Sequence, residues 1–240
     1  MERRRKVTRM RTALLGTQWR GALLGMALAS TAAIFGAVEL AHAQEPHRPG
    51  LFFREDWAET PPALPVTQAD VVNPELVLSL HGPGREGIKK SNHDQPYDDP
   101  FYIWSGEATG NWALSLSHRK QYVDLSRQGK IVWRSKQQGL RELRIVLKLA
   151  DGTWLISDQS DGPASDWRIR EFVVADIRWQ KLNINDVVES GWAKSPNLSK
   201  VEAIGFTDLM RGGKSIACSR LDWIEVYGHP VAREGASKSE

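Results

Sequence analysis

The sequence has a single cysteine, Cys218, among 240 residues. One thiol cannot form an internal disulfide. No histidine lies near Cys218 in the sequence to act as the base that a cysteine nucleophile needs. We therefore expect Cys218 to be a small buried side chain without a chemical role.

Motifs for metals, cofactors and nucleophilic catalysis are also missing. The histidines are scattered, with no H-x-H or H-E-x-x-H pair, so we expect no zinc or iron site. There is no G-x-S-x-G elbow, P-loop or dinucleotide fingerprint. The sequence therefore predicts no catalytic residues, no metal ligands and no cofactor, with one exception left open below.

That exception is a structural calcium ion. Calcium needs several oxygen ligands that converge from carboxylates and carbonyls, and such ligands often lie in loops. One predicted loop carries Asp158, Asp161 and Asp166, and another carries three further aspartates, Asp94, Asp98 and Asp99. Neither spacing fits D-x-D-x-D-G, so solvated aspartates that form turns remain the alternative.

The excess of positive charge is confined to the first 43 residues. Seven of the 32 Lys and Arg and two of the 29 Asp and Glu lie there, which leaves 25 basic and 27 acidic residues in the remainder. The first 20 residues are basic, residues 21–38 are apolar, and Ala41-His42-Ala43 is a small-x-small site. This layout predicts a cleaved secretory signal peptide over residues 1–43. A retained membrane anchor is the alternative, since residues 21–38 are just long enough to span a bilayer.

The chain that follows the predicted leader has no net positive charge, so we expect no nucleic-acid partner. We expect a periplasmic or secreted protein of a bacterial envelope, without stable membrane insertion after cleavage. Its organisation is predicted as a linker over residues 44–50, one domain over 51–229 and a disordered polar tail over 230–240.

No segment keeps the i, i+3, i+4 pattern of a long amphipathic helix. Short alternating segments, separated by Gly, Asp and Pro, predict an all-β antiparallel sandwich or jelly roll instead. Residues 143–149 and 153–157, joined at Asp151-Gly152, predict a hairpin. Residues 184–191 are expected to hold a turn of helix, and residues 85–100 a long polar loop. The other predicted strands are residues 51–57, 75–81, 111–118, 129–136, 168–174, 175–182, 201–207 and 219–227.

The order of these segments resembles galactose-binding-like jelly rolls. The phrases that carry the resemblance are WSGEATGNWALSL, VDLSRQGKIVWRSK, LRIVLKLADGTWL, DIRWQKL, NLSKVEAIGF and SRLDWIEV. They are similar to the complex I intermediate-associated protein group and to family-11 carbohydrate-binding modules. The resemblance covers residues 98–228 and implies a sandwich of eight to ten strands with a glycan-binding face. The Met-Gly-Gly phrase of the assembly-factor members is missing, which argues against an assembly role.

Tryptophan is abundant, with nine of its ten copies after the predicted leader. An indole ring can stack on the C–H face of a sugar, but a tryptophan in an alternating strand usually fills the core. We assign Trp112, Trp133, Trp179 and Trp223 to packing. The predicted ligand-binding residues are those that bracket polar loops, with nearby polar partners: Trp104, Arg134, Trp154, Asp158 and Trp167.

The exposed strand positions also carry basic residues. If they lie on one sheet, they would face acidic sugars or an anionic partner; if they alternate outward in the ordinary way, they are solvated surface. The sequence does not distinguish these cases. The residues concerned are Arg134, Lys136, Arg144, Lys148 and Arg170.

Three functions fit these features. The first is an exported, non-catalytic binding module that recognises a carbohydrate through one sheet face and the adjacent loops. The second is an interaction or scaffold protein with a protein partner in the envelope. The third is a polysaccharide hydrolase or lyase, for which Glu171 and Glu225 on predicted strands are the carboxylates to test.

Overall fold

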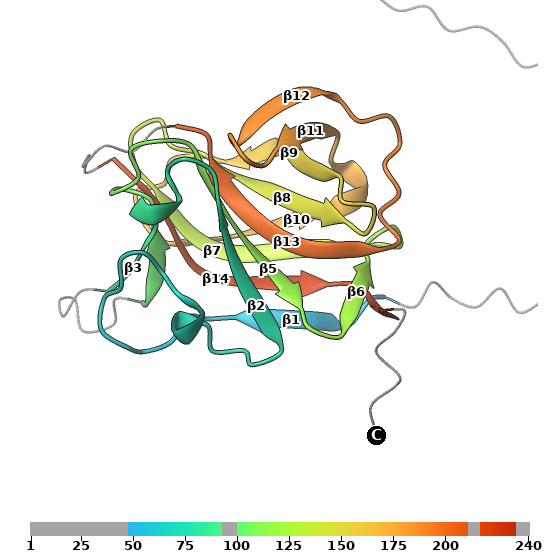
Figure 1. Ribbon diagram of the computed structural model, residues 1–240, viewed down its shortest axis with the longest axis horizontal. Coiled ribbons are helices and arrows are strands. Elements are labelled where there is room, and N and C mark those ends of the chain that lie inside the picture. The colour runs from blue at the N-terminus through green and yellow to red at the C-terminus, as the bar shows by residue number, and fades with distance from the viewer. Residues whose placement is uncertain (1–47, 93–99, 211–216, 234–240) are drawn as a thin grey trace, which may run out of the picture. The chain divides into compact units, whose positions relative to one another are not determined.

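The computed structural model describes residues 48–92, 100–210 and 217–233. The predicted leader, the loop aspartates Asp94, Asp98 and Asp99 and the end of the predicted tail lie outside these residues. The described part is an all-β sandwich of two antiparallel sheets, as the alternation predicts (Figure 1). None of its helices is long and apolar enough to cross a membrane.

The six-stranded sheet has the order β10-β7-β14-β4-β3, with β1 also paired to β14. β14 therefore lies at its centre, between β7 on one side and β4 and β1 on the other. The strands are β1 (Leu51–Glu55), β3 (Lys89–Ser91), β4 (Tyr102–Trp104), β7 (Lys130–Gln137), β10 (Arg168–Val173) and β14 (Ser219–Tyr227).

The nine-stranded sheet has the order β12-β11-β9-β8-β13-β5-β2, with β6 paired to β13 and β15 paired to β6. Its strands are β2 (Leu76–His81), β5 (Trp112–His118), β6 (Gln121–Asp124), β8 (Leu143–Leu149), β9 (Trp154–Asp161), β11 (Trp179–Asn183), β12 (Val188–Trp192), β13 (Val201–Asp208) and β15 (His229–Ala232). Three short 3-10 helices lie in the connections: Gln68–Asp70, Arg85–Gly87 and Val174–Asp176.

The core lies between the two sheets. In a strand, alternate residues point to opposite faces, so one side of each strand supplies core residues. Leu143, Ile145 and Leu147 of β8 and Ile131 and Trp133 of β7 are buried in the same cluster. Trp112 and Trp179, predicted to pack, are also in it, and Cys218 is buried as expected. Burial raises the pKa of the Cys218 thiol, which disfavours the reactive thiolate.

Several boundaries differ from the prediction. Residues 184–191 contain no helix; they form a turn followed by β12, which pairs with β11. Strand β9 continues to Asp161, so the predicted polar loop after residue 157 begins four residues later. The predicted loop over residues 85–100 holds a 3-10 helix and β3. β15 extends the sandwich into residues 230–232, which we expected to belong to the tail.

Candidate functional site

One face of the six-stranded sheet is turned to solvent, and we call it the outer face. On β7, Ile131 and Trp133 point into the core, so Arg134 and Lys136 point outward. Residues directly opposite in neighbouring strands point to the same side, which extends this assignment across the sheet. Five aromatic residues gather on the outer face: Tyr102, Trp104, Trp167, Trp223 and Tyr227.

Each of these aromatic rings has a cation over it. The distances from the cationic group to the ring centroid are 4.4 Å for Arg54 on Trp223, 4.6 Å for Lys130 on Tyr227, 5.3 Å for Lys89 on Trp104, 5.5 Å for Arg134 on Trp167 and 6.0 Å for Arg220 on Tyr102. All lie within the range of cation–π attraction, which is worth only about 0.5–1 kcal/mol at exposed sites. A ligand can therefore displace a cation that no carboxylate holds. The face offers apolar rings beside hydrogen-bond donors.

Trp104 and Trp167 lie at the same end of this face. The Trp167 ring packs on the Tyr102 ring with 5.5 Å between centroids, and Tyr102 is two residues before Trp104 on β4. Both indole side chains are half-buried. A stacking platform requires side chains in a fixed position, because binding then costs little additional conformational entropy.

Arg134 is held in place by Asp222 on β14. Its guanidinium donates a hydrogen bond to Asp222 Oδ2 at 2.7 Å, and the carboxylate is buried. Burial raises the pKa of Asp222 from its ordinary value of 3.8 to about 6, against the opposing effect of Arg134. A charged Asp222 anchors Arg134 over Trp167 above this pKa.

The Asp222 carboxyl is therefore expected to titrate near pH 6. Its proton is bound more tightly in the folded state than in the unfolded one, so the stability that this group contributes is complete below about pH 4 and is lost as the pH rises through 6. Carbon-13 NMR of the aspartate carboxyls should show one midpoint near 6 that disappears in Asp222→Asn. A midpoint at 4 or below for Asp222 would contradict the burial argument.

The structure brings three of the five predicted site residues together. Trp104, Arg134 and Trp167 share the outer face, although they come from β4, β7 and the residue before β10. The other two predicted residues, Trp154 and Asp158, lie on β9 of the nine-stranded sheet and do not belong to this site. The sequence could not show this, because β9 was predicted to end in a loop beside Trp167.

Trp154 has a packing role. Its ring meets the His81 ring with 4.8 Å between centroids, and it packs against a small buried cluster that includes Val146 and Ile156. Burial lowers the pKa of His81 to about 4, with the nearby Lys148 charge as the second cause. A neutral His81 ring shares a hydrogen bond of 2.9 Å with Ser115 Oγ. The Trp154 side chain therefore packs against residues of its own sheet.

Three of the six aspartates considered for calcium lie in the described residues, and each lies beside a different cation. Asp158 pairs with Arg178 at 3.0 Å, and Asp166 lies 3.7 Å from Lys136. Asp161 is fully buried and forms an ion pair with Arg168. In the described residues, no group of three His, Cys, Asp or Glu side chains lies close enough together to hold a metal ion.

The predicted basic set is divided between the sheets. Only Arg134 and Lys136 lie on the outer face, whereas Arg144 and Lys148 are on β8 of the other sheet. Arg170 lies opposite Trp133 and points toward the buried Asp161, at 3.8 Å. The outer face gains its remaining cations from Arg54, Lys89, Lys130 and Arg220, which the prediction did not include.

Trp223 was predicted to pack in the core, and this is wrong. The register of β14 against β7 shifts between Leu221 and Trp223. This β-bulge reverses the alternation, so Leu221 and Ile224 are buried while Trp223 lies on the outer face under Arg54. The sequence contains no signal for a bulge at this position.

The two glutamates considered for hydrolysis also lie on the outer face. Glu171 and Glu225 both lie opposite Val132, one on each side of β7. Glu171 pairs with Lys130 at 2.8 Å, and Glu225 pairs with Arg54 at 2.5 Å and accepts a hydrogen bond from the Tyr227 hydroxyl at 2.8 Å. Both carboxylates therefore hold the cations that cover Tyr227 and Trp223.

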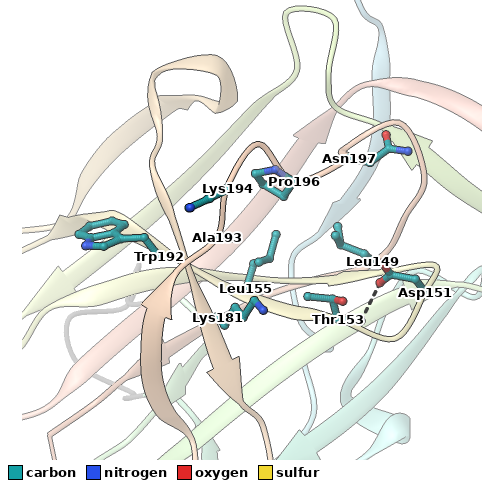
Figure 2. A pocket seen from close by; sticks show the side chains of 10 residues that line it. All are labelled: Leu149, Asp151, Thr153, Leu155, Lys181, Trp192, Ala193, Lys194, Pro196 and Asn197. Atoms are coloured by element: carbon teal, nitrogen blue, oxygen red, sulfur yellow. Dashed lines mark hydrogen bonds between the residues drawn. The ribbon is translucent and has the colours of Figure 1, made fainter.

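A separate hollow of about 430 Å³ lies beside Trp192 at the end of β12 (Figure 2). Trp192 is 51% exposed, and Arg178 lies 4.6 Å over its ring. A second hollow of about 330 Å³ also borders Trp192. The larger hollow is lined by Leu149, Asp151, Thr153, Leu155, Lys181, Trp192, Ala193, Lys194, Pro196 and Asn197. Trp192 was not among the predicted ligand-binding residues.

Comparison with known proteins gives only distant likenesses. No family model matches the chain, and no curated protein matches it. A solved family 11 carbohydrate-binding module from Clostridium thermocellum, in complex with a beta-1,3-1,4-mixed-linked tetrasaccharide, has a TM-score of 0.41 and 16% identity; the match covers 72% of this chain and 98% of the module. A carbohydrate-binding module from Cellvibrio mixtus lichenase 5A, in complex with cellotriose, has a TM-score of 0.31 and 10% identity, covering 59% of this chain and 86% of that one.

An exo-beta-agarase has a TM-score of 0.38 and 12% identity, covering 68% of this chain and 24% of the agarase. The module from Clostridium thermocellum is a family-11 carbohydrate-binding module, a group that the sequence also resembles. At such TM-scores and identities, the likenesses carry no inference about what this chain binds.

Proposed function

We propose that this protein is an exported binding module that recognises a carbohydrate through the outer face of its six-stranded sheet. The observation that carries the proposal is the set of four half-buried aromatic rings on one solvent-facing sheet, Trp104, Trp167, Trp223 and Tyr227, each beside a cation. The fifth ring, Tyr102, is buried and supports Trp167 from below. Aromatic rings bind the apolar face of a sugar, and charged donors and acceptors bind its hydroxyl groups. The basic and apolar leader over residues 1–43 supports export to the periplasm or the exterior.

Trp167→Ala is the test of this site. The variant is expected to weaken binding to an immobilised polysaccharide by about tenfold or more, because a central aromatic anchor typically contributes more than 1 kcal/mol. Its thermal midpoint should stay near that of the wild type, since Trp167 is half-buried on the surface and lies outside the core cluster. Affinity electrophoresis against a panel of neutral and acidic polysaccharides measures the effect.

Trp192→Ala is the matched control. Trp192 is also a surface tryptophan with an arginine over its ring, but it lies at the end of β12 in the other sheet. We expect its affinity to be unchanged. If Trp192→Ala loses binding while Trp167→Ala keeps it, the hollow beside Trp192 is the binding site and the proposed site is wrong.

The two other functions considered from the sequence have different outcomes in the same assay. A hydrolase would release reducing ends from the polysaccharide, and Glu171→Gln or Glu225→Gln would abolish that release. A scaffold protein would bind no member of the polysaccharide panel and would co-purify with an envelope protein. We expect neither outcome.

A further inference from the structure

One row of residues across the outer face is rich in positive charge. Lys89 lies opposite Trp104, Trp104 lies opposite Arg220, and Arg220 lies opposite Lys136. The row therefore crosses four adjacent strands, β3, β4, β14 and β7, in the order Lys-Trp-Arg-Lys. With strands about 4.8 Å apart, it is on the order of 14 Å long.

Within the residues that the structure describes, the charge of this row is poorly compensated. Among the described residues, no carboxylate lies within 4.0 Å of Lys89 or Arg220; their charged groups contact only the Trp104 and Tyr102 rings. The third cation, Lys136, lies 3.7 Å from Asp166, whose side chain is 85% exposed. A solvated pair of this kind contributes little and is readily exchanged for another anion.

The rest of the outer face is different. There Lys130 pairs with Glu171, Arg134 with Asp222 and Arg54 with Glu225, all within 2.8 Å. Cations in these pairs are already neutralised. Among the described side chains, the uncompensated charge is thus concentrated at the end of the face where Trp104 and Trp167 provide stacking surfaces.

From this arrangement we infer that the ligand is an acidic polysaccharide, which lies across the strands with its anionic groups on Lys89, Arg220 and Lys136. This inference rests on the proposed function and specifies its substrate class. A guanidinium can hold a carboxylate or a sulfate through two parallel hydrogen bonds, while the ammonium groups act as point charges. Trp104, between Lys89 and Arg220, stacks on the sugar ring that carries the anion.

Polygalacturonate and its methyl ester test the inference, because they share one backbone and differ in charge. We expect the full-length protein to bind polygalacturonate at least about tenfold more tightly than the ester, and to lose much of this affinity when salt rises from about 0.05 to 0.5 M. Dextran sulfate against dextran forms a second matched pair. Tighter binding in the first pair identifies carboxylate as the preferred anion, and tighter binding in the second identifies sulfate; either result supports the inference.

The double variant Lys89→Gln/Arg220→Gln should lose at least about tenfold of the affinity for the preferred acidic polymer and should no longer distinguish it from its neutral partner. Arg178→Gln is the control, since Arg178 is also a cation over a surface tryptophan but belongs to the other sheet. It should retain wild-type affinity. Equal losses in the double variant and in Arg178→Gln would indicate non-specific charge binding and would overturn the inference.

Two further outcomes separate this inference from the proposed function. If neutral polymers bind as tightly as acidic ones, and Trp167→Ala weakens that binding, the outer face is a carbohydrate site, but the inference that its ligand is acidic is wrong. If no polymer in either pair and no member of the wider panel binds, both proposals fail.

Discussion

Replacing Asp161 by alanine is expected to lower the free energy of unfolding by about 3 kcal/mol. The carboxylate is fully buried, and its Oδ2 accepts a hydrogen bond from the Trp133 indole N–H at 2.9 Å and another from the Ser135 hydroxyl. Arg168 Nε donates to its Oδ1 at 2.9 Å. Alanine leaves the Trp133 and Ser135 donors buried without this acceptor, and each such loss costs about 1–3 kcal/mol.

Asp158→Ala is the matched control, because Asp158 lies on the same strand and also pairs with an arginine. Its side chain is 21% exposed and that of Arg178 is 75% exposed, so water replaces the lost contacts and the cost should stay below about 1 kcal/mol. Urea denaturation of the two variants measures the difference. Asp161→Asn should fall between them, since it keeps an acceptor oxygen but loses the charge facing Arg168. Equal losses in Asp158→Ala and Asp161→Ala would contradict the argument from burial.

Asp161 also illustrates what could not be predicted from the sequence. Asp161 was considered as a loop carboxylate available to calcium, because a run of Ser, Asp and Gly usually marks a loop. Tertiary structure instead extends β9 to Asp161, whose side chain meets a tryptophan from β7 of the other sheet. A contact between sheets leaves no local pattern in the sequence.

The strands that were predicted correctly share a physical basis. In β8, leucine or isoleucine recurs at every second position from 143 to 149, and all four of these side chains are buried. Its hairpin with β9 is confirmed by the pairing of Leu147 with Leu155. The strands that were missed are short: β3 and β4 have three residues each, β6 and β15 four, and β12 five. Three or four residues are too few to show a period of two, and β12 has no buried residue to mark one face.

The candidate site was predictable by residue type but not by position. Trp104, Arg134 and Trp167 were selected because aromatic and charged residues near polar loops favour binding, and they do share one face. The cations Lys89 and Arg220 were missed, since their importance depends on which strands are neighbours. Strand order and register are set by long-range pairing, and a shift of one residue moves every side chain to the opposite face.

Gly205→Ala is expected to cost about 3 kcal/mol or more, or to prevent folding. Gly205 lies on β13, between β5 and β8 in the nine-stranded sheet. A Cβ atom there would lie 1.9 Å from the Leu114 carbonyl oxygen and 2.7 Å from Ser115 Cα. Both are backbone atoms of β5, so no side chain can rotate away and the strands must separate.

Gly50→Ala is the control for Gly205→Ala, because nothing lies within 4 Å of a Cβ at Gly50 and its backbone needs no positive φ. We expect that variant to remain within about 0.5 kcal/mol of the wild type, since alanine only restricts the unfolded chain slightly. Urea denaturation measures the free energy of unfolding of the two variants. If Gly50→Ala folds and no folded Gly205→Ala can be recovered, Gly205→Ala has the larger loss of stability. A Gly205→Ala protein with wild-type stability would mean that β5 and β13 are further apart than the structure places them. The alternation of β13 alone, which predicts a strand here, does not distinguish Gly205 from any other outward-facing position; only the close approach of β5 does.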